Sequence, residues 1–252
     1  MKVSARLSAR TVLVFSGLDP SGGAGIAADL TAIAAQGVHA LPVITTLTVQ
    51  DQNRVHDADP VEASMLLRQA RVLIDALQID AVKIGVVGSR ANAAAIAAII
   101  VRLRALNPAL PVVLDPVLAS GHGDMLTRGD AVAALEPLLS LVTVLTPNLA
   151  EARAVCGTEA GARCQHVLVT GGHGEGAEVI NTWGSREWRW ERLPGEFHGS
   201  GCTLAAAIAA RLALGETVAQ ALDAAQIYVQ RTLAESFCIG PGQRIPRRFH
   251  LP

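Results

Sequence analysis

Residues 11–30 of the chain, TVLVFSGLDPSGGAGIAADL, join a short apolar run to a glycine-rich turn and an alanine-rich segment. The run 11–16 predicts a buried strand, and the apolar spacing over 25–36 predicts a helix. Glycines allow positive φ angles and let a ligand approach the backbone closely. The stretch therefore predicts a strand–turn–helix unit, in which residues 17–25 form either a tight connection or a ligand-binding loop.

The rest of the chain repeats this alternation of apolar runs and helical spacing, which is typical of βαβ units. Residues 178–192 instead predict a hairpin that turns at Gly184-Ser185. The fold class is therefore three-layer α/β/α with a mostly parallel central sheet, in which ligands bind at the carboxyl ends of the strands. Further expected strands are 40–49, 81–84, 111–114, 142–145 and 166–169, and further expected helices are 60–77, 91–106, 131–139, 148–155, 201–214 and 217–234.

Composition excludes several classes of protein. The 252 residues are 50% hydrophobic with a net charge of −1, which excludes disorder and argues against a nucleic-acid binder. The apolar stretch 91–100 is too short to span a membrane, the N-terminus is no signal peptide, and the four cysteines form no CxxC pair. We expect a reduced, cytoplasmic, single domain over 1–252, with 1–10 and 243–252 as peripheral tails.

The segment His198-Gly-Ser-Gly-Cys-Thr203 precedes an alanine-rich helix. Gly199, Ser200 and Gly201 predict a nest of N–H groups that suits a phosphate. The same dipoles would lower the pKa of the Cys202 thiol, so that a thiolate could accept the proton of an attacking hydroxyl. The alternative is an inert, buried cysteine. His198 either helps to bind the phosphate or has only a structural role in capping and packing.

Acidic and amide side chains end other predicted strands. Asp115 follows the strand 111–114, and Asn148 and Glu151 begin the helix after the strand 142–145. Such oxygen ligands suit Mg²⁺. Asn148 and Glu151 also match a capping box, and both roles are compatible.

Seven blocks of the chain resemble, in order, the hydroxymethylpyrimidine and phosphomethylpyrimidine kinases of thiamine biosynthesis. The resemblance implies a ribokinase-like fold and ATP- and Mg²⁺-dependent phosphorylation of 4-amino-5-hydroxymethyl-2-methylpyrimidine and then of its monophosphate. The blocks are GLDPSGGAGIAADL (17–30), VITTLTVQDQ (43–52), VKIGVVGS (82–89), VVLDPVLASGHGD (112–124), VLTPNLAEA (144–152), VLVTGGH (167–173) and HGSGCTLAAAIAA (198–210).

The resemblance also implies roles for single residues. Cys202 matches the proposed catalytic base, and Gly199, Ser200 and Gly201 match the anion hole, with Ser200 where the family more often has Thr. Gln50 would bind the edge of the pyrimidine ring, because a side-chain amide offers both donors and an acceptor. The rest of the substrate site would be Gly17, Asp19, Asp29, Val49 and Val86; the ATP site would include Asn148, Thr170 and Gly172; and Asp115 and Glu151 would hold the metal.

The chain departs from the family pattern in its lysines. It has only two, Lys2 and Lys83, and Gly121 and Thr170 stand where relatives often place a lysine near phosphate. We expect Lys83 to anchor a buried polar contact. The segment 156–166 is also short, which predicts an uncovered apolar face and a homodimer.

Other interpretations remain open. The same fold accommodates a pyridoxine or pyridoxal kinase, and the missing lysines would also fit a pyrimidine-binding regulatory protein that lost catalysis. The tryptophans of the predicted hairpin either pack on the core or stack on adenine. The arginines at 244, 247 and 248 predict a solvated tail.

Overall fold

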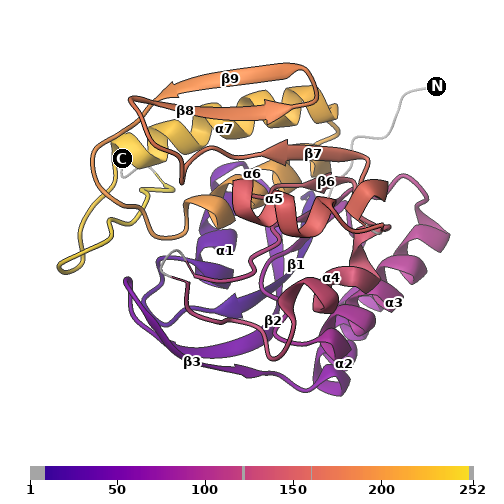
Figure 1. Ribbon diagram of the computed structural model, residues 1–252. Helices are drawn as coiled ribbons and strands as arrows, with labels where there is room; N and C mark the ends of the chain where they lie inside the picture. The colour runs from indigo at the N-terminus through magenta and orange to yellow at the C-terminus, as the bar shows by residue number, and fades with distance from the viewer. Residues whose placement is uncertain (1–8, 121–122, 160, 250–252) are drawn as a thin grey trace.

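The computed structural model describes residues 9–120, 123–159 and 161–249, and it shows a sheet between two layers of helices (Figure 1). Helices α2–α5 pack on one face, and α1, α6 and α7 pack on the other. The helices are α1 (Gly25–Ala35), α2 (Ala63–Ala76), α3 (Arg90–Leu106), α4 (Ala131–Leu139), α5 (Leu149–Cys156), α6 (Ser200–Ala213) and α7 (Val218–Ala234), with a 3₁₀ turn at Gly161–Arg163.

The described strands form one sheet of nine in the order β3-β2-β1-β4-β5-β6-β7-β8-β9. Neighbours from β2 to β7 are parallel, while β3 and the hairpin β8–β9 add antiparallel edges. The predicted three-layer fold with a mostly parallel sheet is confirmed. The strands are β1 (Thr11–Leu18), β2 (His39–Gln50), β3 (Val55–Pro60), β4 (Ala81–Ile84), β5 (Val112–Leu114), β6 (Val144–Leu145), β7 (His166–Val169), β8 (Glu178–Trp183) and β9 (Arg186–Glu191).

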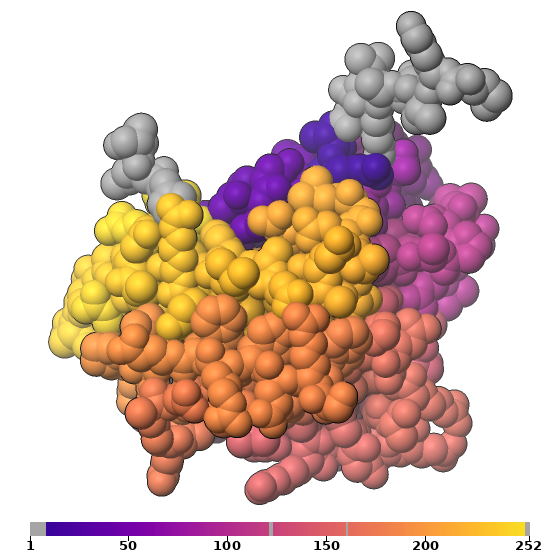
Figure 2. Space-filling view, turned by 90° about the horizontal axis from the view of Figure 1, so that it is seen from above, coloured from indigo at the N-terminus to yellow at the C-terminus, as the bar shows by residue number. Residues whose placement is uncertain are grey.

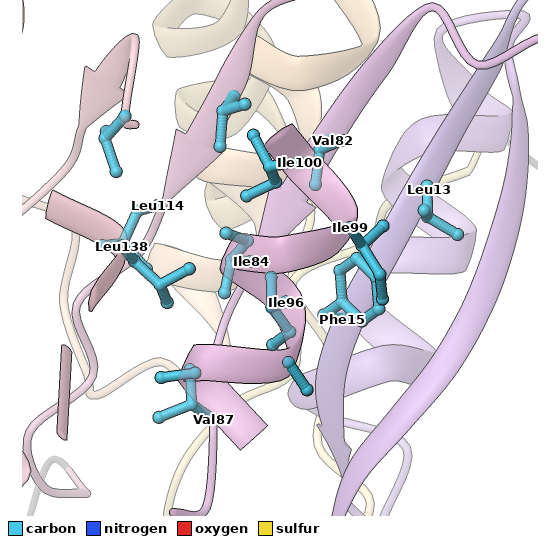
Figure 3. Close-up of a cluster of buried hydrophobic side chains, with 14 of the residues drawn as sticks. Leu13, Phe15, Val82, Ile84, Val87, Ile96, Ile99, Ile100, Leu114 and Leu138 are labelled. Carbon is cyan, nitrogen blue, oxygen red and sulfur yellow. The ribbon is translucent and has the colours of Figure 1, made fainter. Parts of the chain in front are cut away.

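Strand β1 explains why the sheet takes helices on both faces. Leu13 and Phe15 belong to the core cluster under α2–α5, whereas Val12 and Val14 belong to the cluster under α1, α6 and α7. All four are fully buried, because a central parallel strand has no solvent-facing side. Figure 3 shows Leu13 and Phe15 beside the isoleucines of α3.

Most predicted elements occur within a few residues of their expected bounds. The hairpin is present, and Gly184 in its turn has a φ of 57°. Strand β3 was missed, because VHDADP contains no apolar run and pairs only through its backbone with β2. Residue 60 ends this strand, so the helix expected over 60–77 begins instead at Ala63.

The expectation of a peripheral, solvated C-terminal tail was wrong for the described part of that segment. Ile245 and Arg248 are buried. Ile245 exchanges two backbone hydrogen bonds with Phe237, at 2.8 and 3.0 Å, and the carbonyl of Arg244 accepts the His198 N–H at 2.9 Å. Figure 2 shows the yellow C-terminal region lying against the orange hairpin region. Residues 1–8 and 250–252 of the expected tails lie outside the described residues.

No helix in the described ranges is long and apolar enough to cross a membrane.

Candidate active site

The predicted site residues gather at the carboxyl ends of the parallel strands. Asp115 follows β5 directly, Thr170 follows β7, and Gln50 is the last residue of β2. These ends meet along one edge of the sheet, which is where open α/β sheets bind ligands. Segments far apart in the sequence therefore come together there.

Two glycine-rich turns interlock at this edge: the first glycine turn, residues 19–25 after β1, and the second glycine turn, residues 198–201 before α6. Gly199 has a φ of 80°, and a Cβ on it would lie 2.1 Å from the carbonyl oxygen of Gly23. A Cβ on Gly23 would lie 2.3 Å from Cδ2 of His198. Gly199 requires glycine because backbone blocks a Cβ there, whereas a Cβ on Gly23 would require the His198 ring to move.

Asp19 braces the first glycine turn. Its carboxylate accepts hydrogen bonds from the N–H groups of Ser21 at 2.8 Å and Ala24 at 2.7 Å, and it pairs with Nε2 of His198 at 2.8 Å. Burial would raise the pKa of Asp19, but the bonds from His198 and Ser21 outweigh it and lower the pKa. His198 therefore ties the second glycine turn to the first.

The second glycine turn leads directly into α6, which begins at Ser200. The first N–H groups of a helix have no partner inside it, so those of Ser200, Gly201 and Cys202 are free of intrahelical bonds. Gly199 is the N-cap of this helix, whose dipole favours negative charge at the N-terminus, and the anion hole expected from the sequence stays a prediction.

Cys202 lies beside both glycine turns. The Gly25 N–H donates to its sulfur, and its thiol donates to Asp115. The prediction of a lowered pKa was wrong: burial raises the pKa of Cys202 to about 12, and Asp115 and Asp29 add to the rise against the opposing effect of Lys83. Burial and the two carboxylates outweigh Lys83 and the Gly25 N–H, which lower the pKa, so the thiol is protonated in this state.

Lys83 forms the expected buried polar contact. Its Nζ lies 2.8 Å from Oδ1 of Asp29, and neither side chain has any exposed surface. Burial opposes the charge on Lys83, but the carboxylates of Asp29 and Asp115 raise its pKa above the ordinary value. The predicted substrate residue Asp29 is thus oriented toward Lys83.

The remaining predicted substrate residues lie on three neighbouring strands. Gly17 is buried in β1, Val49 and Gln50 end β2, and Val86 follows β4. Val49 is 59% exposed, whereas Gln50 and Val86 are half-buried. A bulge between Val49 and Gln50 interrupts the strict alternation of side-chain faces.

A cavity of about 460 Å³ lies between the hairpin and helices α6 and α7. Known ligand pockets span about 300–1,000 Å³. Its lining includes Ser200 and Gly201, the predicted ATP residues Thr170 and Gly172, and residues with apolar side chains such as Trp190. The cavity thus extends from an apolar hollow to the N-terminus of α6.

The predicted ATP residue Asn148 lies next to this cavity. Its backbone pairs with Thr170 in a short parallel bridge, and its side chain caps α5. The capping box with Glu151 is present, as the sequence indicated. Gly121 lies outside the described residues.

Of the hairpin tryptophans, Trp183 and Trp188 pack on the core, and only Trp190 lines the cavity. The Nε1 of Trp190 donates to Gln226 at 3.4 Å, and Gln226 accepts from Asn181 at 2.8 Å. The hairpin therefore both covers the core and forms one wall of the cavity.

Asp115 and Glu151 supply the candidate metal ligands, and both are largely buried. Burial raises the pKa of Asp115 to about 6 and that of Glu151 to about 7, and the charge of Asp115 adds to the rise for Glu151. Within the described residues, no group of three acidic, His or Cys side chains could hold a metal alone.

Comparison with known proteins identifies the family. The phosphomethylpyrimidine kinase family model matches residues 19–246. The chain belongs to this family. A hydroxymethylpyrimidine/phosphomethylpyrimidine kinase of Rhizobium meliloti (strain 1021) is 40% identical to it, covering 94% of this chain and 96% of that protein. The corresponding protein of Streptomyces coelicolor is 34% identical, covering 92% and 91%.

Solved structures share the fold of this chain. An ADP complex of Bacillus subtilis pyridoxal kinase superimposes with a TM-score of 0.81 at 27% identity, covering 96% of this chain and 98% of that chain. A phosphomethylpyrimidine kinase from Clostridium difficile 630 has a TM-score of 0.71 at 28% identity, covering 88% and 99%.

Two arginines near the site were not predicted from the sequence as functional residues. Arg192 donates to the carbonyls of Gly172 at 2.8 Å and Gly176 at 2.7 Å, bracing the loop that lines the cavity. Arg248 reaches the two glycine turns from the C-terminal segment. Neither lies in a recognisable motif, so only their tertiary contacts identify them.

Proposed function

We propose that this protein transfers the γ-phosphoryl group of ATP to the hydroxymethyl oxygen of 4-amino-5-hydroxymethyl-2-methylpyrimidine, and then phosphorylates the resulting monophosphate to the diphosphate. One observation carries the proposal. The interlocked glycine turns place an anion hole and Cys202 between a cavity of about 460 Å³ and the strand ends that hold Gln50. Membership of the phosphomethylpyrimidine kinase family supports the choice of acceptor.

The two substrates would approach the second glycine turn from opposite sides. ATP occupies the cavity, with its base against the apolar wall and its phosphates toward Thr170, Gly172 and Gly201. The pyrimidine lies over the ends of β1, β2 and β4, where Gln50 offers both donors and an acceptor to the ring edge. The acceptor hydroxyl then faces the terminal phosphate.

Phosphoryl transfer needs mainly positioning and charge stabilisation, because its transition state is loose. The acceptor oxygen forms a bond to the γ-phosphorus while the bond to the bridging oxygen breaks, and ADP leaves with the electron pair. The N–H groups of the anion hole hold the oxygens of the transferred group. Cys202, which keeps partial exposure, releases its own thiol proton to solvent, and its sulfur then accepts the proton of the acceptor hydroxyl.

Mg²⁺ fits the residues beside the anion hole. Mg²⁺ bound with nucleotide usually takes one or two carboxylates, with phosphate oxygens and water completing its shell. Asp115 and Glu151 provide two buried carboxylates that interact with each other, and Asn148 provides an amide oxygen nearby. When bound, the ion supplies positive charge that neutralises the phosphates.

The direct test is turnover by the purified protein. ATP is supplied with the hydroxymethylpyrimidine, with its monophosphate or with pyridoxal, and the products are identified by ³¹P NMR. We expect the first two acceptors to give mono- and diphosphate. Turnover of pyridoxal alone would establish the second candidate, which the resemblance to Bacillus subtilis pyridoxal kinase favours. Pyrimidine binding without ATP consumption would identify a regulatory protein.

The proposed homodimer rests on the uncovered face near the short segment 156–166. Three of the four residues of β7, His166, Val167 and Val169, keep partial exposure. A second copy of the chain would cover this edge of the helical layer. Light scattering coupled to size-exclusion chromatography should give twice the mass of 26.2 kDa, and a strict monomer would contradict it.

A further inference from the structure

Arg248 enters the protein interior at the point where the two glycine turns touch. Its Nη2 donates to the carbonyl oxygens of Gly23, in the first glycine turn, and Gly199, in the second. Its Nε donates to the hydroxyl of Thr203 in α6 at 2.8 Å. The guanidinium therefore bridges both turns and the helix that follows them.

The position of Arg248 is fixed by its own backbone. Its carbonyl accepts the Tyr228 hydroxyl at 2.6 Å, and the preceding residue Arg247 donates its N–H to Thr232 at 2.9 Å. Both partners belong to α7, so the C-terminal segment is anchored before it reaches the glycine turns. Arg248 is only 5% exposed as a result.

Among the described residues, the charge of Arg248 has no close counter-ion. In the described ranges, its hydrogen-bond acceptors are two carbonyls and one hydroxyl, and no carboxylate lies within ion-pair distance. Asp29 and Asp19 act on it only through longer-range attraction. A buried cation normally has a paired anion, because desolvation of an unpaired charge is costly.

We propose that Arg248 is a positioning residue for phosphoryl transfer, which holds the two glycine turns in register and supplies positive charge behind the anion hole. The inference rests on the proposed function, in which the second glycine turn binds the transferred phosphoryl group. The missing anion is then the substrate itself.

The positive charge of Arg248 acts on the phosphate through a single peptide group. The Gly199 carbonyl that accepts from Arg248 belongs to the peptide whose N–H is that of Ser200. A charged donor at the carbonyl polarises the peptide and strengthens the hydrogen bond that its N–H donates. The gain is greatest in the transition state, where the phosphoryl oxygens carry most charge and the donors are already oriented.

The experiment compares R248M, R248Q and R248K with R247M in the full chain. Arg247 is the matched control, because it is adjacent and packs over Phe237 but touches neither glycine turn. We expect R248M and R248Q to lower kcat by about 100-fold, with smaller changes in either KM, because the lost interaction is strongest in the transition state. R248K should recover part of that loss, and R247M should behave like the wild type.

Chemical rescue separates the charge from the packing. In R248A, millimolar guanidinium should raise kcat by about tenfold, because charge-assisted bonds are stronger than neutral ones. Urea, which has nearly the same shape without the charge, should not. Equal kcat in R248M and the wild type, equal kcat in R248K and R248M, or equal rescue by urea would each overturn the inference.

The proposed function can fail independently. If the wild-type chain phosphorylates no acceptor, the readout becomes the affinity for inorganic phosphate by calorimetry, and R248M should bind it about tenfold more weakly than R247M. Equal phosphate affinities would overturn the inference in that case. If R248M fails to fold, the inference is tested by the kcat of R248K and by the guanidinium rescue of R248A.

Discussion

Replacing Gly199 by alanine tests whether contact between the two glycine turns creates the active site. A Cβ at this position would lie 2.1 Å from the Gly23 carbonyl oxygen and 2.9 Å from Cα of Ala24. Ordinary contacts begin near 3.4 Å, so the first glycine turn would have to retreat by more than 1 Å. The φ of 80° adds a second penalty, because alanine disfavours left-handed backbone.

The expected magnitude follows from these two penalties. The left-handed conformation costs about 1–2 kcal/mol, and forced overpacking costs about 1–3 kcal/mol. In a chain of this size, a loss of about 3 kcal/mol lowers Tm by about 6–12 °C. A displacement of about 1 Å between the acceptor turn and the anion hole should lower kcat by about 100-fold.

Gly215→Ala is the matched control. Gly215 has a φ of 92°, but a Cβ there would meet no atom within 4 Å. G215A should therefore lose only about 1–2 kcal/mol from the backbone penalty and keep its kcat. Tm from scanning calorimetry and steady-state kinetics measure both variants. If G199A matched G215A in Tm and kcat, the turns would not depend on this contact, and the reasoning would be refuted.

Three further outcomes are expected. C202A should lower kcat by about 10²–10⁴-fold while pyrimidine binding, measured by calorimetry, is retained. K83M leaves the Asp29 carboxylate buried and unpaired, so the free energy of unfolding in urea should fall by about 3–5 kcal/mol. D19N should be about 2 kcal/mol less stable than the wild type near neutral pH, because Asp19 loses charged hydrogen bonds. Since the pKa of Asp19 is lowered below 3.8 in the folded state, this difference is present above pH 3.8 and disappears as the pH falls through the folded pKa.

Each of these outcomes has a contrary result. A C202A chain with parental kcat would remove Cys202 as the proton acceptor. If K83M loses no stability, or the double variant K83M/D29L is no more stable than K83M, the buried pair does not determine stability. A D19N difference that grows on acidification would reverse the sign expected from the lowered pKa.

Local sequence determined the elements that rest on neighbouring residues. The run VLVF in β1 has only apolar side chains, which predicts from the sequence alone that both faces of the strand are buried. The Asn148–Glu151 capping box acts across three residues, and the hairpin turn needs only Gly184 and its flanking strands. The ordered motifs also located the first glycine turn after a strand and the second before a helix.

Only the tertiary structure decided the properties that depend on distant neighbours. The polar strand β3 forms because β2 offers it a backbone edge, which no periodicity reveals. The pKa of Cys202 rises because burial is reinforced by the carboxylates of Asp115 and Asp29, which are remote in sequence. Arg248 looks like part of a polar tail until the chain folds. Its charge is then confined between two glycine turns with no carboxylate beside it in the described structure, because long-range packing sets both burial and electrostatics.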